Sequence, residues 1–315
     1  MTGQSRQPSI LSAVNALEGR LVVDLTRLLP GAFASRELLR LGARVVRIEP
    51  PDGDPMRTID PGWHDKLNAG KESVAVDLKA EPAFGRALCE RADVVLEGFR
   101  PGVAERLGLA PGPRTVWVSL TGFGTDNRHE QRAGHDLNYL GWAGVLEGTA
   151  PAMPPVTVAD FTGSFATVRE VLAGLLERET TGRGKHSVVS MTHESHRLAV
   201  PPVLTGAAAC YRIYETADGR FLTVAALEPK FWRRLCELVG VPALGSRQFE
   251  PQLPELDAAI RARPLADWLE LFDTEDVCAG PVASLEEAAE FAEPTQGHAP
   301  AIGAHTEAWR KELAS

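Results

Sequence analysis

Short apolar runs alternate with stretches of helical spacing through the first two thirds of the chain. Residues 19–49 give a β-branched run, a turn with Pro30 and Gly31, a helical pattern and a second apolar run, which together predict a βαβ unit. Because further strands alternate with helical patterns, we predict an α/β fold with a mostly parallel, doubly wound, Rossmann-like sheet. These further strands are predicted at Ser73–Val76, Asp93–Leu96 and Thr115–Leu120.

A long helical pattern ends this part of the chain. Asp160–Arg178 carries apolar residues at helical spacing, and the glycines of TTGRGK end it before a strand predicted at Ser187–Ser190. We therefore expect a large α/β domain over residues 1–200, with residues 286–315 returning to it. A terminal helical turn is predicted at Trp309–Leu313.

The next segment has the pattern of a smaller α+β domain, which we place at residues 201–285. Two predicted strands, Ala209–Tyr214 and Arg220–Ala225, are joined at Asp218-Gly219, a dipeptide typical of hairpin turns. A helix is predicted at Pro229–Val239.

The composition of the 315 residues, 44% hydrophobic and 24% charged, is that of a folded globular protein. The net charge of −9 argues against a nucleic-acid partner, because such a protein needs a basic surface to displace phosphate counterions. No apolar stretch is long enough to span a bilayer, and the N-terminus lacks a signal-peptide pattern. We therefore expect a cytoplasmic enzyme without a membrane partner.

Common metal and cofactor signatures are absent from the sequence. His193 and His196 lack the HExxH spacing, the turn after the first strand is LTRLLPGAFAS rather than GxGxxG, and no GxxxxGK[ST] loop occurs. Ser119 lacks the flanking glycines of a GxSxG nucleophile. We therefore predict no metal and no prosthetic group. The cysteines form no CxxC pair and are expected to be reduced packing residues: Cys89, Cys210, Cys236 and Cys278.

Seven segments occur in one order along the chain, and together they carry a family resemblance. The segments are LTRLLPGAFASRELLRLGARVVRIEPPDGDPMR, LNAGKESVAVDLK, ADVVLEGFRPGVAERLGL, SLTGFG, AGHDLNYLGWAGVL, VADFTGS and ALEPKFW. From residue 19 to residue 285 they resemble the superfamily of family III coenzyme A transferases (CaiB/BaiF) and 2-methylacyl-CoA racemases. The resemblance implies an acyl-CoA substrate, with coenzyme A as part of that substrate, and an interlocked homodimer.

The block AGHDLNYL is similar to the racemase branch, in which a histidine directly precedes an aspartate. The resemblance implies that His135 and Asp160 are the two catalytic bases and that Glu228 orients the imidazole. Asp136 has two readings: a nucleophile that forms an acyl anhydride in a transferase, or a structural and ligand-binding carboxylate in a racemase. The adjacent histidine favours the second reading.

Moving a proton from one face of a carbon to the other requires one group that takes it and another, on the opposite side, that returns it. Histidine suits this role near neutral pH, whereas a carboxylic acid, with a usual pKa of about 3.9, must first be raised by burial. Asp160 follows Val156–Ala159 and precedes Phe161, a setting compatible with desolvation. Backbone N–H groups of Gly134–Tyr139 would stabilise the enolate if a helix begins there.

Coenzyme A carries several phosphate charges, which an acidic protein must hold with local cations. Arg47, Lys71 and Arg100 follow predicted strands or lie in loops, where the ligands of open α/β sheets bind. Taken singly, such cations are more often solvated surface charges, and Asp160 and Glu228 are more often helix caps. The resemblance assigns coenzyme A contacts to Arg47, Asn68, Ala69, Gly70, Lys71, Arg100, Gly134 and Tyr139.

The sequence departs from the family pattern in several places. The segment Met191–Cys210 and the segment after Glu290 are shorter than is usual, and Asn127 and Arg128 replace a glycine-proline pair. Three functions therefore stay open: a racemase or epimerase of 2-methylacyl-CoA esters, a family III transferase that acts through Asp136, and a non-catalytic acyl-CoA binder. We expect the first.

Overall fold

The computed structural model describes residues 15–292 and 297–315. These residues form two compact units. The first contains the described residues up to Leu198 together with the C-terminal segment from Gly297, and the second contains the described residues from Ala199 to Ala292. Separate hydrophobic clusters form the cores of the two units, so each is described by itself.

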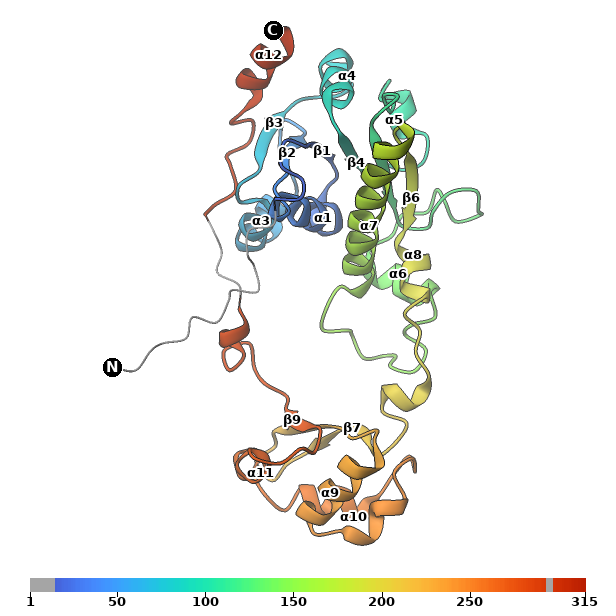
Figure 1. The fold of residues 1–315 in the computed structure, drawn as a ribbon, viewed down its shortest axis with the longest axis vertical. Helices are drawn as coiled ribbons and strands as arrows, with labels where there is room; N and C mark the ends of the chain where they lie inside the picture. The colour runs from blue at the N-terminus through green and yellow to red at the C-terminus, as the bar shows by residue number, and fades with distance from the viewer. Residues whose placement is uncertain (1–14, 293–296) are drawn as a thin grey trace, which may run out of the picture. The chain divides into compact units, whose positions relative to one another are not determined.

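The first unit is built on a six-stranded sheet in the order β3-β2-β1-β4-β5-β6, and every neighbouring pair is parallel (Figure 1). The chain begins in the middle at β1, runs to one edge and then returns to fill the other, which confirms the predicted doubly wound α/β fold. The strands are β1 (Leu21–Leu25), β2 (Arg44–Glu49), β3 (Glu72–Ala75), β4 (Val94–Glu97), β5 (Val116–Thr121) and β6 (His186–Ser190). The helices are α1 (Leu28–Arg40), α2 (Met56–Ile59), α3 (Pro61–Asn68), α4 (Pro82–Arg91), α5 (Val103–Arg106), α6 (Asp136–Trp142), α7 (Val158–Thr181), α8 (Met191–His196) and α12 (Thr306–Ala314).

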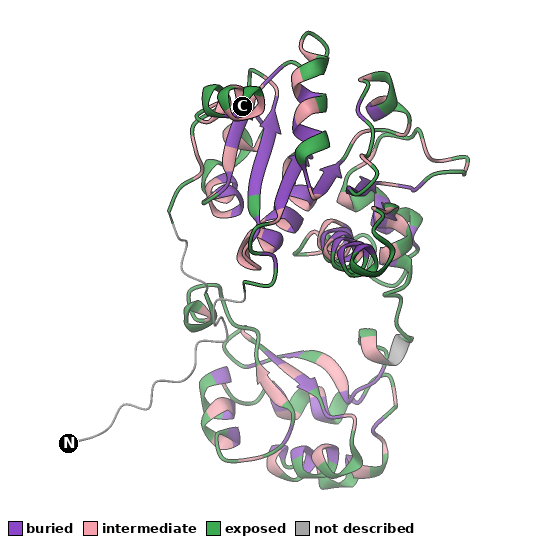
Figure 2. Ribbon diagram, turned by 45° about the horizontal axis from the view of Figure 1, so that its top comes forward, coloured by how far each residue is buried: buried purple, intermediate pink, exposed green. Residues whose placement is uncertain are grey.

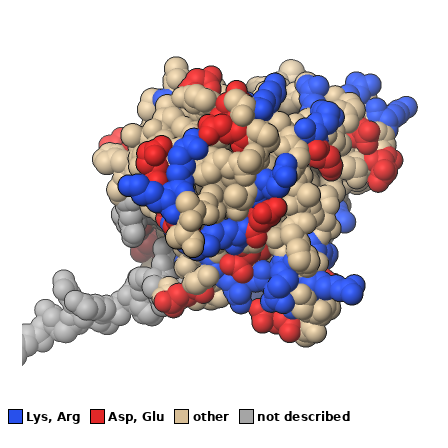
Figure 3. All heavy atoms as spheres, turned by 90° about the horizontal axis from the view of Figure 1, so that it is seen from above, with Lys and Arg blue, Asp and Glu red and all other residues tan. Residues whose placement is uncertain are grey.

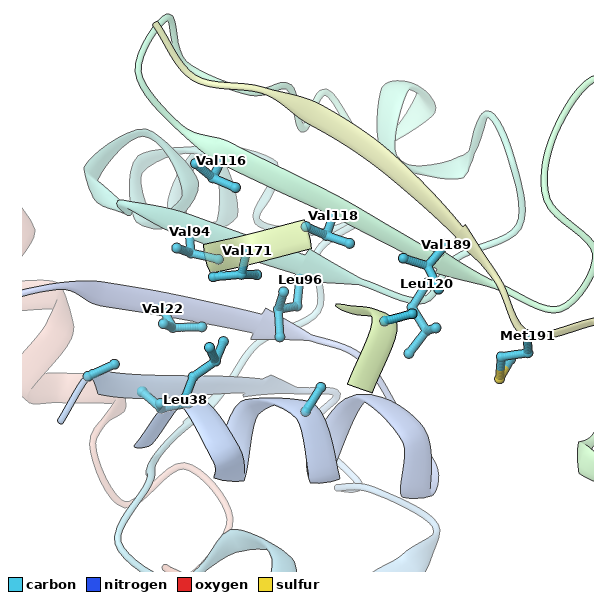
Figure 4. Close-up of a cluster of buried hydrophobic side chains, with 14 of the residues drawn as sticks. Val22, Leu38, Val94, Leu96, Val116, Val118, Leu120, Val171, Val189 and Met191 are labelled. Atoms are coloured by element: carbon cyan, nitrogen blue, oxygen red, sulfur yellow. The ribbon is translucent and has the colours of Figure 1, made fainter. Parts of the chain in front are cut away.

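The central strands of this sheet are buried on both faces (Figure 2). Val22 of β1 packs with Leu38 of α1 and Val171 of α7 in one cluster (Figure 4). Its neighbour Val23 points to the other face and packs in a second cluster with Trp309 of α12. Because both of their faces are covered, the central strands are nearly continuous apolar runs, which is why the sequence pattern located them.

The C-terminal segment covers the free edge of β3. The Ser73 N–H donates to His305 Nδ1 at 3.1 Å, the Ala75 N–H donates to Thr306 Oγ1 at 3.0 Å, and the His305 N–H donates to the Ser73 carbonyl at 2.9 Å. Trp309 is fully buried beneath Arg44, whose guanidinium lies 4.3 Å from the indole centroid. The segment thereby satisfies backbone groups that an open sheet edge would leave unpaired. The resulting helix, α12, is longer than the predicted turn at Trp309–Leu313.

The second unit has a three-stranded antiparallel sheet in the order β7-β8-β9. The predicted hairpin and the helix at Pro229–Val239 are present, whereas β9 and the helices α10 and α11 are not part of the sequence prediction. Trp232 and Trp268 are almost completely buried in its core. The elements are β7 (Tyr211–Glu215), β8 (Phe221–Ala225), β9 (Ala279–Pro281), α9 (Pro229–Val239), α10 (Pro254–Ile260) and α11 (Leu265–Phe272), with 3-10 turns at Pro202–Thr205, Pro242–Ser246 and Ala289–Phe291.

Acidic and basic side chains are interspersed over the face drawn in Figure 3. Within residues 15–292 and 297–315, no helix has the length and apolar character that crossing a membrane requires. Three cysteines are buried and Cys278 is exposed, and all four are free thiols.

Candidate active site

Three neighbouring cavities lie at the carboxyl ends of the parallel strands, where open α/β sheets bind their ligands. The central cavity, of about 530 Å³, is lined by both His135 and Asp160. A second cavity, of about 480 Å³, is lined by His135 and Arg100, and a third, of about 370 Å³, by Arg27 and Lys79. Gly98 lines all three, so the cavities adjoin one another in the first unit.

His135 lies at the N-cap of α6, with extended backbone and an exposed side chain. Its backbone N–H donates to Asn138 Oδ1 at 3.1 Å, which fixes the start of the helix. The Tyr139 hydroxyl donates to the Gly134 carbonyl, and burial raises the pKa of this phenol to about 12. A helix therefore does begin within Gly134–Tyr139, as the enolate-binding hypothesis requires, and both of these residues line the central cavity.

Asp160 lies in the first turn of α7 and is half-buried. Burial, and then the nearby negative charge of Asp136, raise the pKa of the Asp160 carboxyl to about 7. A carboxyl group with this pKa is present in both protonation states near neutral pH. Asp160 can therefore give or accept a proton in the same cavity that His135 lines.

Asp136 has a structural contact that connects the starts of two helices. Its Oδ1 accepts a hydrogen bond from the backbone N–H of Asp160 at 3.0 Å, so a residue of α6 caps the first turn of α7. Among the described residues that line the central cavity, Asp160 is present and Asp136 is not. Asp136 thus acts on the site through Asp160, both by this hydrogen bond and by its charge.

Arg47 and Lys71 are buried rather than solvated. The Arg47 guanidinium donates to Asp24 at 3.3 Å and also to Asp54. Burial lowers the pKa of Lys71 to about 7. The Lys71 ammonium group donates to the Ala32 carbonyl at 2.8 Å, Ser35 Oγ at 2.8 Å and Asn68 Oδ1 at 2.9 Å.

The remaining predicted coenzyme A contacts differ in their positions. Asn68 is buried in the same polar network, while Ala69 and Gly70 follow the end of α3. Arg100 is exposed and lines the second cavity. Of the cations predicted for coenzyme A, Arg100 lines one of these three cavities, whereas Arg47 and Lys71 line none of the three.

Three exposed cations at the cavities were missed by the sequence prediction: Arg27, Lys79 and Arg132, the last of which lines the second cavity. Arg27 follows β1 and lines both the central and the third cavity, and Lys79 follows β3 and lines the third. The signal of Arg27 and Lys79 in the sequence is their place after predicted strands. Arg27 in particular lies between β1 and α1, where the strand order reverses from β1 to β4 and ligands commonly bind.

Glu228 belongs to the second unit, where it is exposed at the N-cap of α9. Its predicted contact with the His135 imidazole therefore stays a prediction. Within the described residues, no group of three or more His, Cys, Asp or Glu side chains is arranged to hold a metal ion.

A family model described as CoA-transferase family III matches residues 17–301 of the chain. The chain is similar to the alpha-methylacyl-CoA racemase of Homo sapiens, with 34% identity over 310 residues that cover 86% of this chain and 79% of the relative. It is also similar to the acetyl-CoA:oxalate CoA-transferase of Acetobacter aceti, with 30% identity over 322 residues that cover 86% of this chain and 82% of the relative. Among solved structures, the hypothetical protein Rv3272 from Mycobacterium tuberculosis matches with a TM-score of 0.81 and 28% identity, covering 93% of this chain and 98% of that chain.

Proposed function

The chain belongs to the family III coenzyme A transferases, and from this premise we propose that it is a racemase or epimerase of 2-methylacyl-CoA thioesters. One observation carries the proposal: the central cavity is lined by a histidine and by an aspartate whose pKa is raised to about 7. Histidine and aspartate side chains are groups that can take a proton from a substrate and return one to it. The racemase named among the relatives supports the choice of substrate.

In the proposed reaction, one of the two groups removes the α-proton from one face of the thioester, and the other returns a proton to the opposite face. The intermediate is an enolate, whose oxygen carries the developing negative charge. The N-terminus of α6, which begins at Asp136 directly after His135, favours negative charge in this region. No second substrate is consumed, because a proton leaves and a proton is returned.

The coenzyme A part of the substrate carries phosphate groups, and exposed cations at the cavities can bind them. Arg27, Lys79 and Arg100 are exposed and line the central, third and second cavities. We propose that these three side chains hold the phosphates. The polar atoms of Arg47 and Lys71 bond to buried groups instead. These two side chains would then support the ligand-binding surface from inside the protein.

A coenzyme A transferase is the second candidate, because a transferase also occurs among the relatives. A transferase would need a carboxylate that attacks the thioester carbonyl and forms a mixed anhydride, with coenzyme A thiolate as the leaving group. Asp160 lines the central cavity, whereas Asp136 is not among the described residues that line it. In this alternative we therefore assign the nucleophile to Asp160 rather than to Asp136.

One incubation separates the two reactions. The protein is mixed with a chiral 2-methylacyl-CoA in heavy water, with and without an added free carboxylic acid. A racemase incorporates deuterium at the α-carbon without the free acid, and the His135→Ala variant loses this exchange while Asp136→Ala retains part of it. A transferase instead moves coenzyme A to the added acid, forms a hydroxylamine-sensitive acyl group at Asp160, and retains transfer in His135→Ala. The absence of both reactions would contradict the proposal and leave an acyl-CoA binder.

We also propose that the protein is a homodimer in which Glu228 assists His135 from the partner chain. Phe165, Leu172 and Leu176 of α7 are 57%, 39% and 73% exposed, and their spacing puts them on one side of the helix. Mixing the inactive variants His135→Ala and Glu228→Ala tests the shared site. Activity that returns on subunit exchange supports it, whereas activity that stays absent in a verified mixed dimer contradicts it.

A further inference from the structure

We infer that Asp54 is a positioning residue for the proposed reaction: it fixes the apolar wall of the central cavity against which the acyl chain of the thioester lies. This inference rests on the proposed function and specifies the acyl side of the same site. The apolar wall consists of Leu28, Leu29, Met56 and Ile59, all of which line the central cavity.

The apolar wall comes from two separate segments, and Asp54 hydrogen-bonds to both. Its Oδ2 accepts from the Leu28 N–H at 3.0 Å, at the start of α1. Its Oδ1 accepts from the Met56 N–H at 2.7 Å, at the start of α2. One carboxylate therefore sets the distance between the two halves of the wall.

Leu28 has a backbone conformation that needs such support. Its φ is 61°, in the left-handed region that leucine and other bulky residues rarely adopt. Residues held in such conformations cluster at binding and active sites, where the surrounding structure must hold them. The hydrogen bond from the Leu28 N–H to Asp54 is the contact that fixes the backbone at this residue.

Asp54 is itself held in place by buried ionic groups. It is 3% exposed, its carboxylate contacts the Arg47 guanidinium, and its backbone N–H donates to Glu49 Oε2 at 3.0 Å. Glu49 in turn accepts two hydrogen bonds from Arg57, at 2.8 Å and 2.7 Å. Because Arg47 balances its charge and Glu49 holds its backbone, Asp54 is suited to hold the wall in place.

The chemistry of the wall defines the class of acyl group. The four apolar side chains favour a hydrocarbon chain as the acyl group. Because Ile59 is 70% exposed, this chain would extend from the thioester toward the outside of the cavity. His135 and Asp160 line the same cavity. The position of the wall therefore determines how the α-carbon is presented to the two proton-transfer groups.

The test is a pair of double variants that differ in one methyl group. Asp54→Ala is combined either with Leu28→Gly or with Leu28→Ala, since both remove the isopropyl group of leucine but only glycine adopts the left-handed conformation without strain. We measure α-deuterium exchange for acyl-CoAs of increasing chain length, and their affinities by titration calorimetry, which does not require turnover. Asp54→Asn, which keeps one acceptor oxygen, serves as a milder variant if Asp54→Ala does not fold.

We expect Asp54→Ala to lower kcat/KM about tenfold for long acyl chains and to flatten the preference between long and short chains. Adding Leu28→Gly restores kcat/KM to within about threefold of Leu28→Gly alone, whereas adding Leu28→Ala does not. Equal behaviour of the two double variants, or an unchanged chain-length preference in folded Asp54→Ala, would overturn the inference. If the wild-type protein binds acyl-CoAs without exchanging the α-hydrogen, the proposed function fails and the calorimetric preferences still decide the role of Asp54. A wild-type protein that binds no acyl-CoA overturns both.

Discussion

Carboxylates on two sides of the central cavity have opposite surroundings. On the side of the apolar wall, the Asp54 carboxylate contacts the Arg47 guanidinium. The nearby Glu49 has a pKa of about 2: burial alone would raise this pKa, but hydrogen bonds from Arg57 and Ser73 lower it. On the other side, burial and the like charge of Asp136 raise the pKa of Asp160 to about 7. The comparison shows how one fold assigns different roles to acids. A buried acid beside a cation stays charged and holds the structure, whereas an acid beside another acid can change protonation state.

The largest effect should come from removing the titrating acid. We expect Asp160→Asn to lower the rate of α-deuterium exchange by about 10³-fold, because an amide cannot carry the proton. Exchange is followed by mass spectrometry after quenching. Affinity for the acyl-CoA, measured in parallel, should change by much less, and a variant that keeps more than about a tenth of the exchange rate would remove Asp160 from the mechanism.

The next effect concerns the paired side of the cavity. Arg47→Met should lower the free energy of unfolding by about 3 kcal/mol, because it leaves Asp24 and Asp54 buried without their cation. Denaturant unfolding measures this change. The matched control is Arg27→Met, at an exposed position, which should change stability by less than about 0.5 kcal/mol. Equal changes in the free energy of unfolding for Arg47→Met and Arg27→Met would contradict the claim that the buried ion pairs of Arg47 stabilise the protein.

Ionisation of Asp160 should also affect the free energy of unfolding. The pH dependence that it causes should have the opposite sign to that of an acid paired with a cation. Because the pKa is about 7 in the folded protein and about 3.9 when unfolded, folding takes up a proton between these values and stability falls as pH rises through this window. Asp160→Asn should therefore be more stable than wild type at pH 8, by about 1–2 kcal/mol after allowing for the partial exposure of the side chain. The gain should vanish below about pH 4. A gain that is independent of pH would exclude titration as its cause.

A smaller effect is expected from the exposed cations. Arg27→Gln or Lys79→Gln should raise the KM for acyl-CoA by about three- to tenfold and leave kcat nearly unchanged, because phosphate contacts remote from the reacting carbon bind ground state and transition state alike. Steady-state kinetics at two salt concentrations measure this. The same substitutions should have no effect on binding of a pantetheine thioester that lacks the phosphates, and an equal loss for that compound would contradict the assignment.

The central strands of the sheet could be predicted because they are buried on both faces and therefore form apolar runs between helices. The short strand β9 could not, since its Ala-Gly-Pro sequence contains two residues that are depleted in strands. The helices α10 and α11 have only seven and eight residues, which gives a weak periodic signal.

The site was predicted in part, and the reason lies in side-chain direction. The sequence shows a cation near the end of a predicted strand, but it does not show whether the side chain points to a cavity or into the protein. Arg47 lies within β2, opposite Asp24 of β1 in the parallel register, and this partner is more than twenty positions away in the chain. Similarly, the contact between Asp136 and the first turn of α7 depends on how α6 meets α7, which no local pattern specifies.

The most direct test of the central claim is an NMR titration of the Asp160 carboxyl carbon in wild type and in Asp136→Asn, with the signal assigned by its loss in Asp160→Asn. We predict that Asp160 titrates near pH 7 in the wild type, as burial and Asp136 together require. In Asp136→Asn the pKa should be lower, because the like charge is gone while the burial remains. An Asp160 that titrates near its ordinary value of about 3.9 in the wild type would contradict the account.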